Sequence, residues 1–209
     1  MIDEDVAEAT LKSAESKGSL LLAEVRSEER SSRDLSVKAS QVSSISTFQD
    51  SGMNVRIVLN SGIGFASSNV VSKAEGSRLV KQAFKLAKTA SRKTPVALSP
   101  ESAIKTSWEV RQKRPLADVS AEERLEYLNS LDSAVMKTKV KVQGRFYELK
   151  DFEFSGYFAN SEGSRIRSFL PRLKVEALHF VSAKGQTAQS IRQWGAAGGW
   201  EMKDDWDLL

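Results

Sequence analysis

Apolar residues recur at helical spacing near the start of the chain, which predicts a helix over residues 3–17. The acidic residues at its beginning and Gly18 at its end are typical of helix termini. Its buried side would carry Val6, Ala7, Thr10, Leu11 and Ala14.

Two further helices follow capping boxes, in which a serine precedes a glutamate by three residues. Ser72 and Glu75 introduce the first, and Ser120 and Glu123 introduce a helix over residues 121–136. The core face of the first would be Leu79, Val80, Ala83, Phe84, Leu86, Ala87 and Ala90, and that of the second Leu125, Leu128, Leu131 and Val135.

Between these helices the apolar positions alternate with a period of two, which predicts antiparallel hairpins. In the first half the strands would cover residues 20–25, 35–39, 42–45, 53–59 and 63–66, with a tight turn at 60–62. In the second half they would cover 139–147, 152–158, 164–169, 173–183 and 187–194.

A segment with three prolines and little periodicity separates the two halves. We therefore predict an α+β protein of two helix-plus-antiparallel-sheet units joined by a Pro-containing connector. Residues 1–92 would form an N-terminal α+β domain, 93–118 the connector with one strand near 104–110, and 119–209 a second, strand-rich domain.

The composition is that of an ordinary globular protein with 209 residues, 40% of them hydrophobic, and a net charge of +4. The chain has no cysteine, which excludes disulfides, thiolate metal sites and a cysteine nucleophile. An acidic N-terminus without a long apolar run lacks the pattern of a signal peptide. We expect a soluble, cytoplasmic protein.

The residues needed for common catalytic sites are missing. His179 is the single histidine, whereas a metallopeptidase site needs several converging ligands. No G-x-S-x-G and no G-x-x-x-x-G-K-[ST] motif occurs. The glycines of residues 195–199 indicate a flexible joint or a close backbone approach. We therefore expect no catalytic, metal-binding or cofactor-binding residue in this chain.

Several motifs in order resemble the TldD/PmbA proteins, also called modulators of DNA gyrase. One is the G-F-A-[ST]-x-N hairpin, which this chain has as Gly64, Phe65, Ala66, Ser67, Ser68 and Asn69 within residues 52–69. The opening strand of the family, with its E-x-R motif, is similar to residues 24–26 together with 32–42. The family's N-S-[DE]-G turn corresponds to residues 160–163, and its glycine-rich passage to residues 186–193 and 195–201. Residues 118–123 fit the segment that begins the family's second region.

The resemblance implies the front part of a metallopeptidase whose H-E-x-x-x-H helix would lie in a C-terminal domain beyond Leu209. A divalent, zinc-like metal is expected only in that domain. The resemblance also implies one wall of a peptide cleft, and homodimers or heterodimers with a TldD/PmbA-type subunit. Candidate wall residues are Gly62, Gly64, Phe65 and Ala66, whose glycines could instead serve a tight hairpin; Asn160, Ser161 and Gly163 would be structural.

Two alternatives remain beside this non-catalytic peptidase part. The chain could be a stand-alone adaptor that pairs with a complete subunit. It could also be a basic nucleic-acid-binding domain, for which Lys81, Lys85 and Lys88 would form a stripe rather than a solvated helix face. The interleaving of acidic and basic residues argues against nucleic acid, and no membrane contact is expected.

Three tryptophans, Trp194, Trp200 and Trp206, lie close together near the C-terminal residue. We expect them to be hard to bury without further chain or a partner; the alternative is a place in the core, with Trp194 closing the last hairpin.

Overall fold

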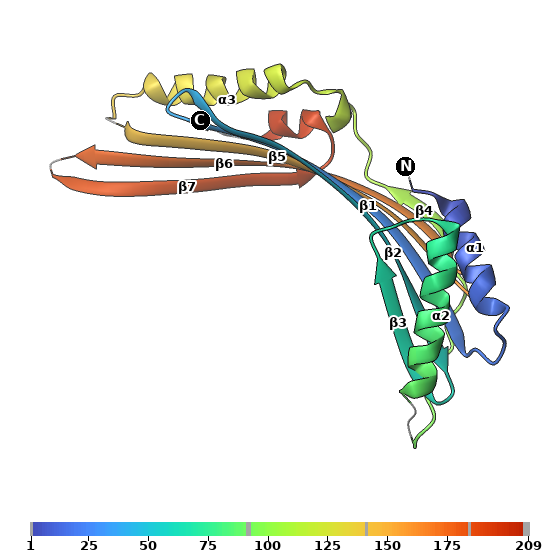
Figure 1. Cartoon of the computed structure of the whole chain (residues 1–209). Helices are drawn as coiled ribbons and strands as arrows, with labels where there is room; N and C mark the ends of the chain where they lie inside the picture. The colour runs from blue at the N-terminus through green and yellow to red at the C-terminus, as the bar shows by residue number, and fades with distance from the viewer. Residues whose placement is uncertain (1, 91–92, 141, 184, 207–209) are drawn as a thin grey trace. The chain divides into compact units, whose positions relative to one another are not determined.

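A computed structural model describes residues 2–90, 93–140, 142–183 and 185–206 (Figure 1). The helices are α1 (Glu4–Glu15), α2 (Lys73–Thr89) and α3 (Ala121–Met136), with short 3-10 turns at Leu116–Asp118 and Trp200–Asp205. The strands are β1 (Leu22–Lys38), β2 (Gln41–Leu59), β3 (Gly62–Ser68), β4 (Lys105–Glu109), β5 (Val142–Asn160), β6 (Arg165–Ala183) and β7 (Gln186–Ala197). The α+β class is confirmed.

The strands form one seven-stranded sheet in the order β3-β2-β1-β5-β6-β4, with β7 also paired to β6. Hairpins make β2 and β3, and β6 and β7, antiparallel. The expectation of antiparallel pairing throughout is wrong at one place, because β4 runs parallel to β6. The chain between β4 and β6 passes through α3 and β5, a connection long enough for parallel partners.

Several predicted strands are parts of longer ones. Residues 139–147 were expected to be separate from 152–158, but residues 142–160 form the single strand β5. The predicted strands 164–169 and 173–183 likewise belong to β6, which continues through Pro171. On one side of β6, the pairing with β4 ends at Phe169 and the pairing with β7 begins at Arg172. The missing N–H of Pro171 therefore interrupts neither ladder.

The chain divides into two compact units. Unit 1 comprises Met1–Arg30, Gln49–Glu109 and Phe154–Phe169, and unit 2 comprises Ser31–Phe48, Val110–Glu153 and Leu170–Leu209. Both are discontinuous, and four strands contribute residues to both of them. The predicted domains 1–92 and 119–209 and the connector 93–118 are continuous segments, and that division stays a prediction.

In unit 1, α1 and α2 cover one face of the strands (Figure 1). The Ser72 hydroxyl accepts a hydrogen bond from the Glu75 N–H (3.2 Å), as the capping box predicts. The predicted core face of α2 is correct for Leu79, Val80, Ala83 and Ala87, and Phe84 packs against the core while half-buried. Leu86 and Ala90 are exposed, contrary to expectation. Leu86 lies beyond the side of the helix that the strands cover, and Ala90 is the C-cap residue after the end of α2.

In unit 2, the core lies between α3 and the sheet. Leu128 and Leu131 are buried as predicted, and Leu125 is half-buried against them. The same helix also buries Arg124, whose guanidinium forms an ion pair with the buried Asp151 of β5. The guanidinium also donates to the carbonyls of Leu116 (2.6 Å) and Val119 (3.2 Å), so its burial is compensated.

The tryptophan expectation is wrong for this structure. Trp200 is buried in the core of unit 2, edge-on to the Tyr127 ring with 5.6 Å between ring centroids. Trp194 and Trp206 are partly buried against the same core. The turn at Gly199 makes this packing reachable, because a Cβ there would lie 2.2 Å from the Arg114 carbonyl oxygen. The predicted close backbone approach in residues 195–199 therefore occurs at Gly199.

Within the described residues, no helix is both long and apolar enough to cross a membrane.

Candidate functional site

The predicted wall residues of β3 divide between two faces of the strand. Gly62, Gly64 and Ala66 are buried, whereas Ile63 and Phe65 are exposed on the other side. This alternation follows from the two-residue period of a strand. Only Phe65 of the four predicted residues therefore lies on the exposed face.

The glycines of β3 allow the strand to lie directly against α2. A Cβ at Gly64 would be 1.9 Å from the Ala83 carbonyl oxygen, and one at Gly62 would be 2.4 Å from that of Ala87. The two backbones can come this close because α2 has alanines at the contact and β3 has glycines, which carry no side chain. The close approach is thus made to the chain's own helix.

The face of unit 1 that α1 and α2 leave free combines polar and aromatic side chains. Along β2, Asn54 is opposite Ser67 and Arg56 is opposite Phe65. Arg56 forms an ion pair with Glu24 of β1. Farther along β1, two arginines lie over aromatic rings of β5. The guanidinium of Arg26 is 5.1 Å from the centroid of the Phe158 ring. The guanidinium of Arg30 is 5.8 Å from the centroid of the Phe154 ring.

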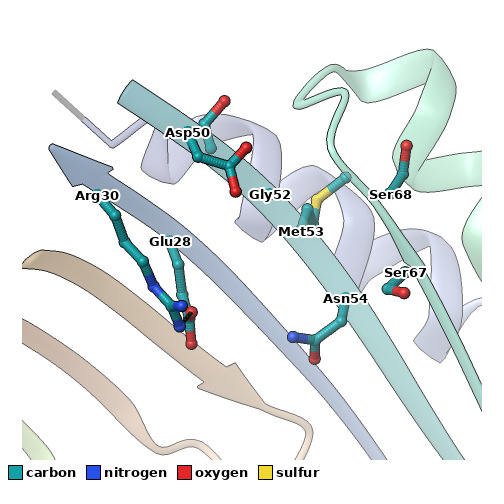
Figure 2. Close-up of a pocket in the computed structure, with 9 residues that line it drawn as sticks. Glu28, Arg30, Asp50, Gly52, Met53, Asn54, Ser67 and Ser68 are labelled. Carbon is teal, nitrogen blue, oxygen red and sulfur yellow. Dashed lines mark hydrogen bonds and ion pairs between the residues drawn. The ribbon is translucent and has the colours of Figure 1, made fainter. Parts of the chain in front are cut away.

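A polar hollow of about 190 Å³ opens where β1, β2 and β3 adjoin (Figure 2). An ion pair of 2.8 Å joins Glu28 to Arg30 at its β1 side. Gly52 leaves room on β2, since a Cβ there would be 3.2 Å from the Ser68 carbonyl oxygen. The lining residues are Glu28, Arg30, Asp50, Ser51, Gly52, Met53, Asn54, Ser67 and Ser68.

The hydrogen-bonding groups of this hollow are not equally available. The Ser68 hydroxyl accepts a bond from the Val70 N–H (3.1 Å). Hydrogen bonds from Arg78 and from Ser68 lower the pKa of Glu75 to about 2, so this carboxylate stays ionised. Asn54 lines the hollow as an amide that can both donate and accept. The site can thus hold a polar group by hydrogen bonds. The carboxylate that is bonded to the Ser68 hydroxyl, Glu75, is a weak base because its pKa is low.

This hollow was not predicted from the sequence. The available signal was the alternation of charged residues along residues 24–30, which places Glu24, Arg26, Glu28 and Arg30 on one face of a strand.

The residues of the 160–163 turn hold β5, β6 and β1 together. The Asn160 side chain accepts from the Ser164 N–H (2.8 Å), and Gly163 has a φ of +97°, which favours glycine. Ser161 donates its backbone N–H to the Ala23 carbonyl (2.9 Å), and its hydroxyl accepts from the Ala23 N–H (3.0 Å). Asn160 and Ser161 thus join this turn to the start of β6 and to β1 by hydrogen bonds, and their structural role stays a prediction.

His179 belongs to a hydrogen-bonded network in unit 2. Its Nε2 lies 2.9 Å from the hydroxyl of the buried Tyr147. Burial lowers the pKa of His179, which favours the neutral imidazole. The serine of the network, Ser40, is hydrogen-bonded to Asp132 rather than to the histidine, and Asp132 is also paired with Arg145. The arrangement is not that of a Ser–His–Asp triad, in which the histidine contacts the serine.

The described residues also contain no group of three or more His, Cys, Asp or Glu side chains placed to hold a metal ion. They therefore do not fit the divalent metal that the resemblance implies.

A shallow groove beside Lys17 is lined by Lys81, Lys85 and Lys88 of α2. The Lys88 ammonium lies 4.7 Å from the centroid of the half-buried Phe84 ring. Such a contact is typical of a lysine that covers apolar surface while its charge stays in water.

Comparison with known proteins relates this geometry to a family. Residues 23–87 match the model of PmbA/TldA metallopeptidase domain 1. A metalloprotease of Methanocaldococcus jannaschii is 26% identical over 186 residues, which are 88% of this chain and 41% of that protein. A metalloprotease of Methanothermobacter thermautotrophicus is 28% identical over 194 residues, 89% of this chain and 40% of that protein. The resemblance to the TldD/PmbA family is confirmed.

Solved structures share the fold at low sequence identity. A Bacteroides thetaiotaomicron protein named as a modulator of DNA gyrase has a TM-score of 0.77 and 12% identity, over 93% of this chain and 45% of that one. TldE from Thermococcus kodakarensis has a TM-score of 0.64 and 18% identity, over 92% of this chain and 42% of that one.

The segment matched to the first TldD/PmbA domain holds most of the candidate site. It runs from Ala23 in β1 to Ala87 in α2 and includes the whole of β2 and β3. All nine residues that line the hollow lie inside it, whereas the 160–163 turn lies outside it. The chain spans about two fifths of the length of the two metalloproteases that it matches.

Proposed function

We propose that this chain forms the non-catalytic front part of a TldD/PmbA-like metallopeptidase and contributes to its peptide cleft and its subunit interface. The metal would be held elsewhere in the assembly, since the described residues provide no ligand group for it. The observation that carries the cleft proposal is the position of β3 at the end of the strand order, with Ile63 and Phe65 exposed.

An extended peptide can bind to such an edge by adding a strand through backbone hydrogen bonds. Side chains that project from the exposed face then contact alternate residues of the peptide. In this arrangement Phe65 would be an apolar contact. Gly62, Gly64 and Ala66 would hold the strand against α2 and would not touch the peptide.

The polar hollow beside β3 supports the same function. Asn54 and Ser67 are opposite each other on β2 and β3, next to the pair of Arg56 and Phe65. A peptide along β3 would bring its polar groups within reach of this amide and hydroxyl. Recognition through backbone and small polar groups suits a peptidase that accepts unfolded segments of varied sequence.

The test is to measure metal content and cleavage of unfolded, fluorescein-labelled casein, for this chain alone and after mixing with a complete TldD/PmbA-type subunit. We expect no stoichiometric metal and no cleavage for the chain alone, and changed cleavage by the mixture. Stoichiometric metal or cleavage by the chain alone would refute the non-catalytic role.

A matched pair of variants tests the cleft. Phe65→Ala removes an exposed aromatic ring from β3, whereas Leu86→Ala removes a similarly exposed side chain (44% against 53%) from α2 of the same unit. We expect Phe65→Ala to lower cleavage by the mixture and Leu86→Ala to leave it unchanged. Equal activities of the two variants would show that the exposed face of β3 does not contact the peptide.

A further inference from the structure

The first part of β2 is exposed on both faces of the sheet. Every residue from Val42 to Phe48 is exposed, including the apolar side chains of Val42, Ile45 and Phe48. The surrounding sequence, residues 41–49, contains no charge, no proline and no glycine. An exposed strand with three large apolar residues is costly to leave in water.

Among the residues that the structure describes, this part of β2 is also a free edge. Its neighbour on one side is β1, whereas β3 pairs only with Met53–Leu59, farther along the same strand. Edge strands usually carry charges that discourage pairing with other chains. The edge strand β4 has Lys105 and Glu109, and β7 has Arg192, but residues 42–48 have none.

The segment 42–48 is complementary to itself in the antiparallel direction. Reading it against a second copy places Ile45 opposite Ile45, and Val42 opposite Phe48. Ser44 then faces Ser46 and Ser43 faces Thr47, so that apolar residues meet apolar ones and hydroxyls meet hydroxyls. A two-fold symmetric interface requires this kind of self-complementarity, because the same surface serves both subunits.

We propose that two copies of this chain associate through residues 42–48 of β2, paired antiparallel about a two-fold axis at Ile45. The unpaired backbone groups of the edge would form hydrogen bonds with those of the partner strand, and the two sheets would become continuous. This pairing would provide the subunit contact of the proposed function. The evidence for it is independent of peptide cleavage. Its test uses only the oligomeric state of this chain.

The first experiment is sedimentation velocity of the full chain over a range of concentrations, with Ile45→Lys compared with Ile191→Lys. The two isoleucines are similarly exposed (62% and 54%), and both lie on edge strands of unit 2. Ile45→Lys would place two ammonium groups directly opposite each other at the axis. We expect it to raise the dimer Kd about tenfold or more, which corresponds to about 1.4 kcal/mol, and Ile191→Lys to leave it unchanged.

The absence of cysteine allows a second, direct experiment. Residues directly opposite in an antiparallel pair have Cα atoms about 4.5–5.5 Å apart, within the range of a disulfide. Ile45→Cys should therefore form a disulfide-linked dimer under mild oxidation, while Ile191→Cys should stay largely uncrosslinked.

Charge pairs test the register. Val42→Lys combined with Phe48→Glu would place opposite charges across both ends of the interface, whereas Val42→Lys with Phe48→Lys would place like charges there. We expect the first double variant to dimerise and the second to be monomeric.

A chain that sediments as a monomer at about 100 μM would overturn the proposal, as would equal crosslinking of Ile45→Cys and Ile191→Cys. A dimer that Ile45→Lys leaves intact would show that the copies associate through another surface. None of these results depends on metal or peptidase activity.

Discussion

Because β3 and α2 are in such close contact, we predict that adding one methyl group to β3 at Gly64 destabilises unit 1. Gly64→Ala would place a Cβ 1.9 Å from the Ala83 carbonyl oxygen and 2.6 Å from the Ala87 backbone nitrogen. Both neighbours are backbone atoms of a helix, so no side-chain rotation can relieve the overlap.

The size of the effect follows from the movement that the methyl group requires. Bringing the 1.9 Å contact to an ordinary 3.4 Å needs a local displacement of α2 by about 1.5 Å. That displacement would loosen a helix whose Leu79, Val80 and Ala83 are fully buried. Overpacking of a close-packed core costs about 1–3 kcal/mol, and we expect the upper part of this range because the clash is with backbone.

Urea unfolding followed by far-UV circular dichroism measures this loss, with Gly195→Ala as the matched control. Gly195 also lies within a strand, but its Cβ would be 3.6 Å from the nearest atom, an ordinary contact. Alanine there should be neutral or stabilise by up to about 1 kcal/mol, because it restricts the unfolded chain. A Gly64→Ala variant as stable as Gly195→Ala would refute the packing argument. Gly64→Val, which clashes more severely, would for the same reason be a poor probe of peptide binding.

Two further predictions concern a buried ion pair and a half-buried histidine of unit 2. Asp151→Ala would leave the buried Arg124 without its carboxylate partner, and we expect a loss of about 3–5 kcal/mol in the free energy of unfolding. The same change at the exposed Asp50 should alter it by less than about 0.5 kcal/mol, and similar losses for both would contradict this account. The single histidine permits an unambiguous NMR titration, and the pKa of His179 should fall below about 6.5 because burial disfavours its charged form. As the pH falls through about 6.5, the unfolded chain takes up a proton before the folded one, so stability declines until the folded-state pKa is passed. This part of the decline should disappear in His179→Gln, and a pKa at or above 6.5 would contradict the burial argument.

The local features of the fold were predictable from the sequence. Both serine N-caps form as expected, with the Ser72 and Ser120 hydroxyls accepting from the N–H groups of Glu75 and Glu123. Helix α3 begins and ends at the predicted residues 121 and 136. Such features are predictable because the groups involved are within four residues of one another. The order of short motifs also sufficed to recognise the TldD/PmbA resemblance.

The packing partners were not predictable in the same way. Asp151 lies between the predicted strands 139–147 and 152–158, yet in the structure it is inside β5 and pairs with Arg124, 27 residues earlier. Pro171 lies between the predicted strands 164–169 and 173–183, but β6 continues through it because the neighbouring strand on one side changes at that point.

The candidate site shows the same division between local and tertiary information. The sequence alone determined that residues 62–66 form a glycine-containing strand after a tight turn, because alternation and turn chemistry act between neighbours. Only the tertiary structure decided that α2 lies against Gly62 and Gly64, so that Phe65 is left on the exposed face. Likewise, the strand pattern of residues 42–45 was readable from the sequence, whereas its position at a free edge was not. A face or an edge becomes covered or free only through elements that are distant in the chain, and the periodicity of a single segment carries no information about them.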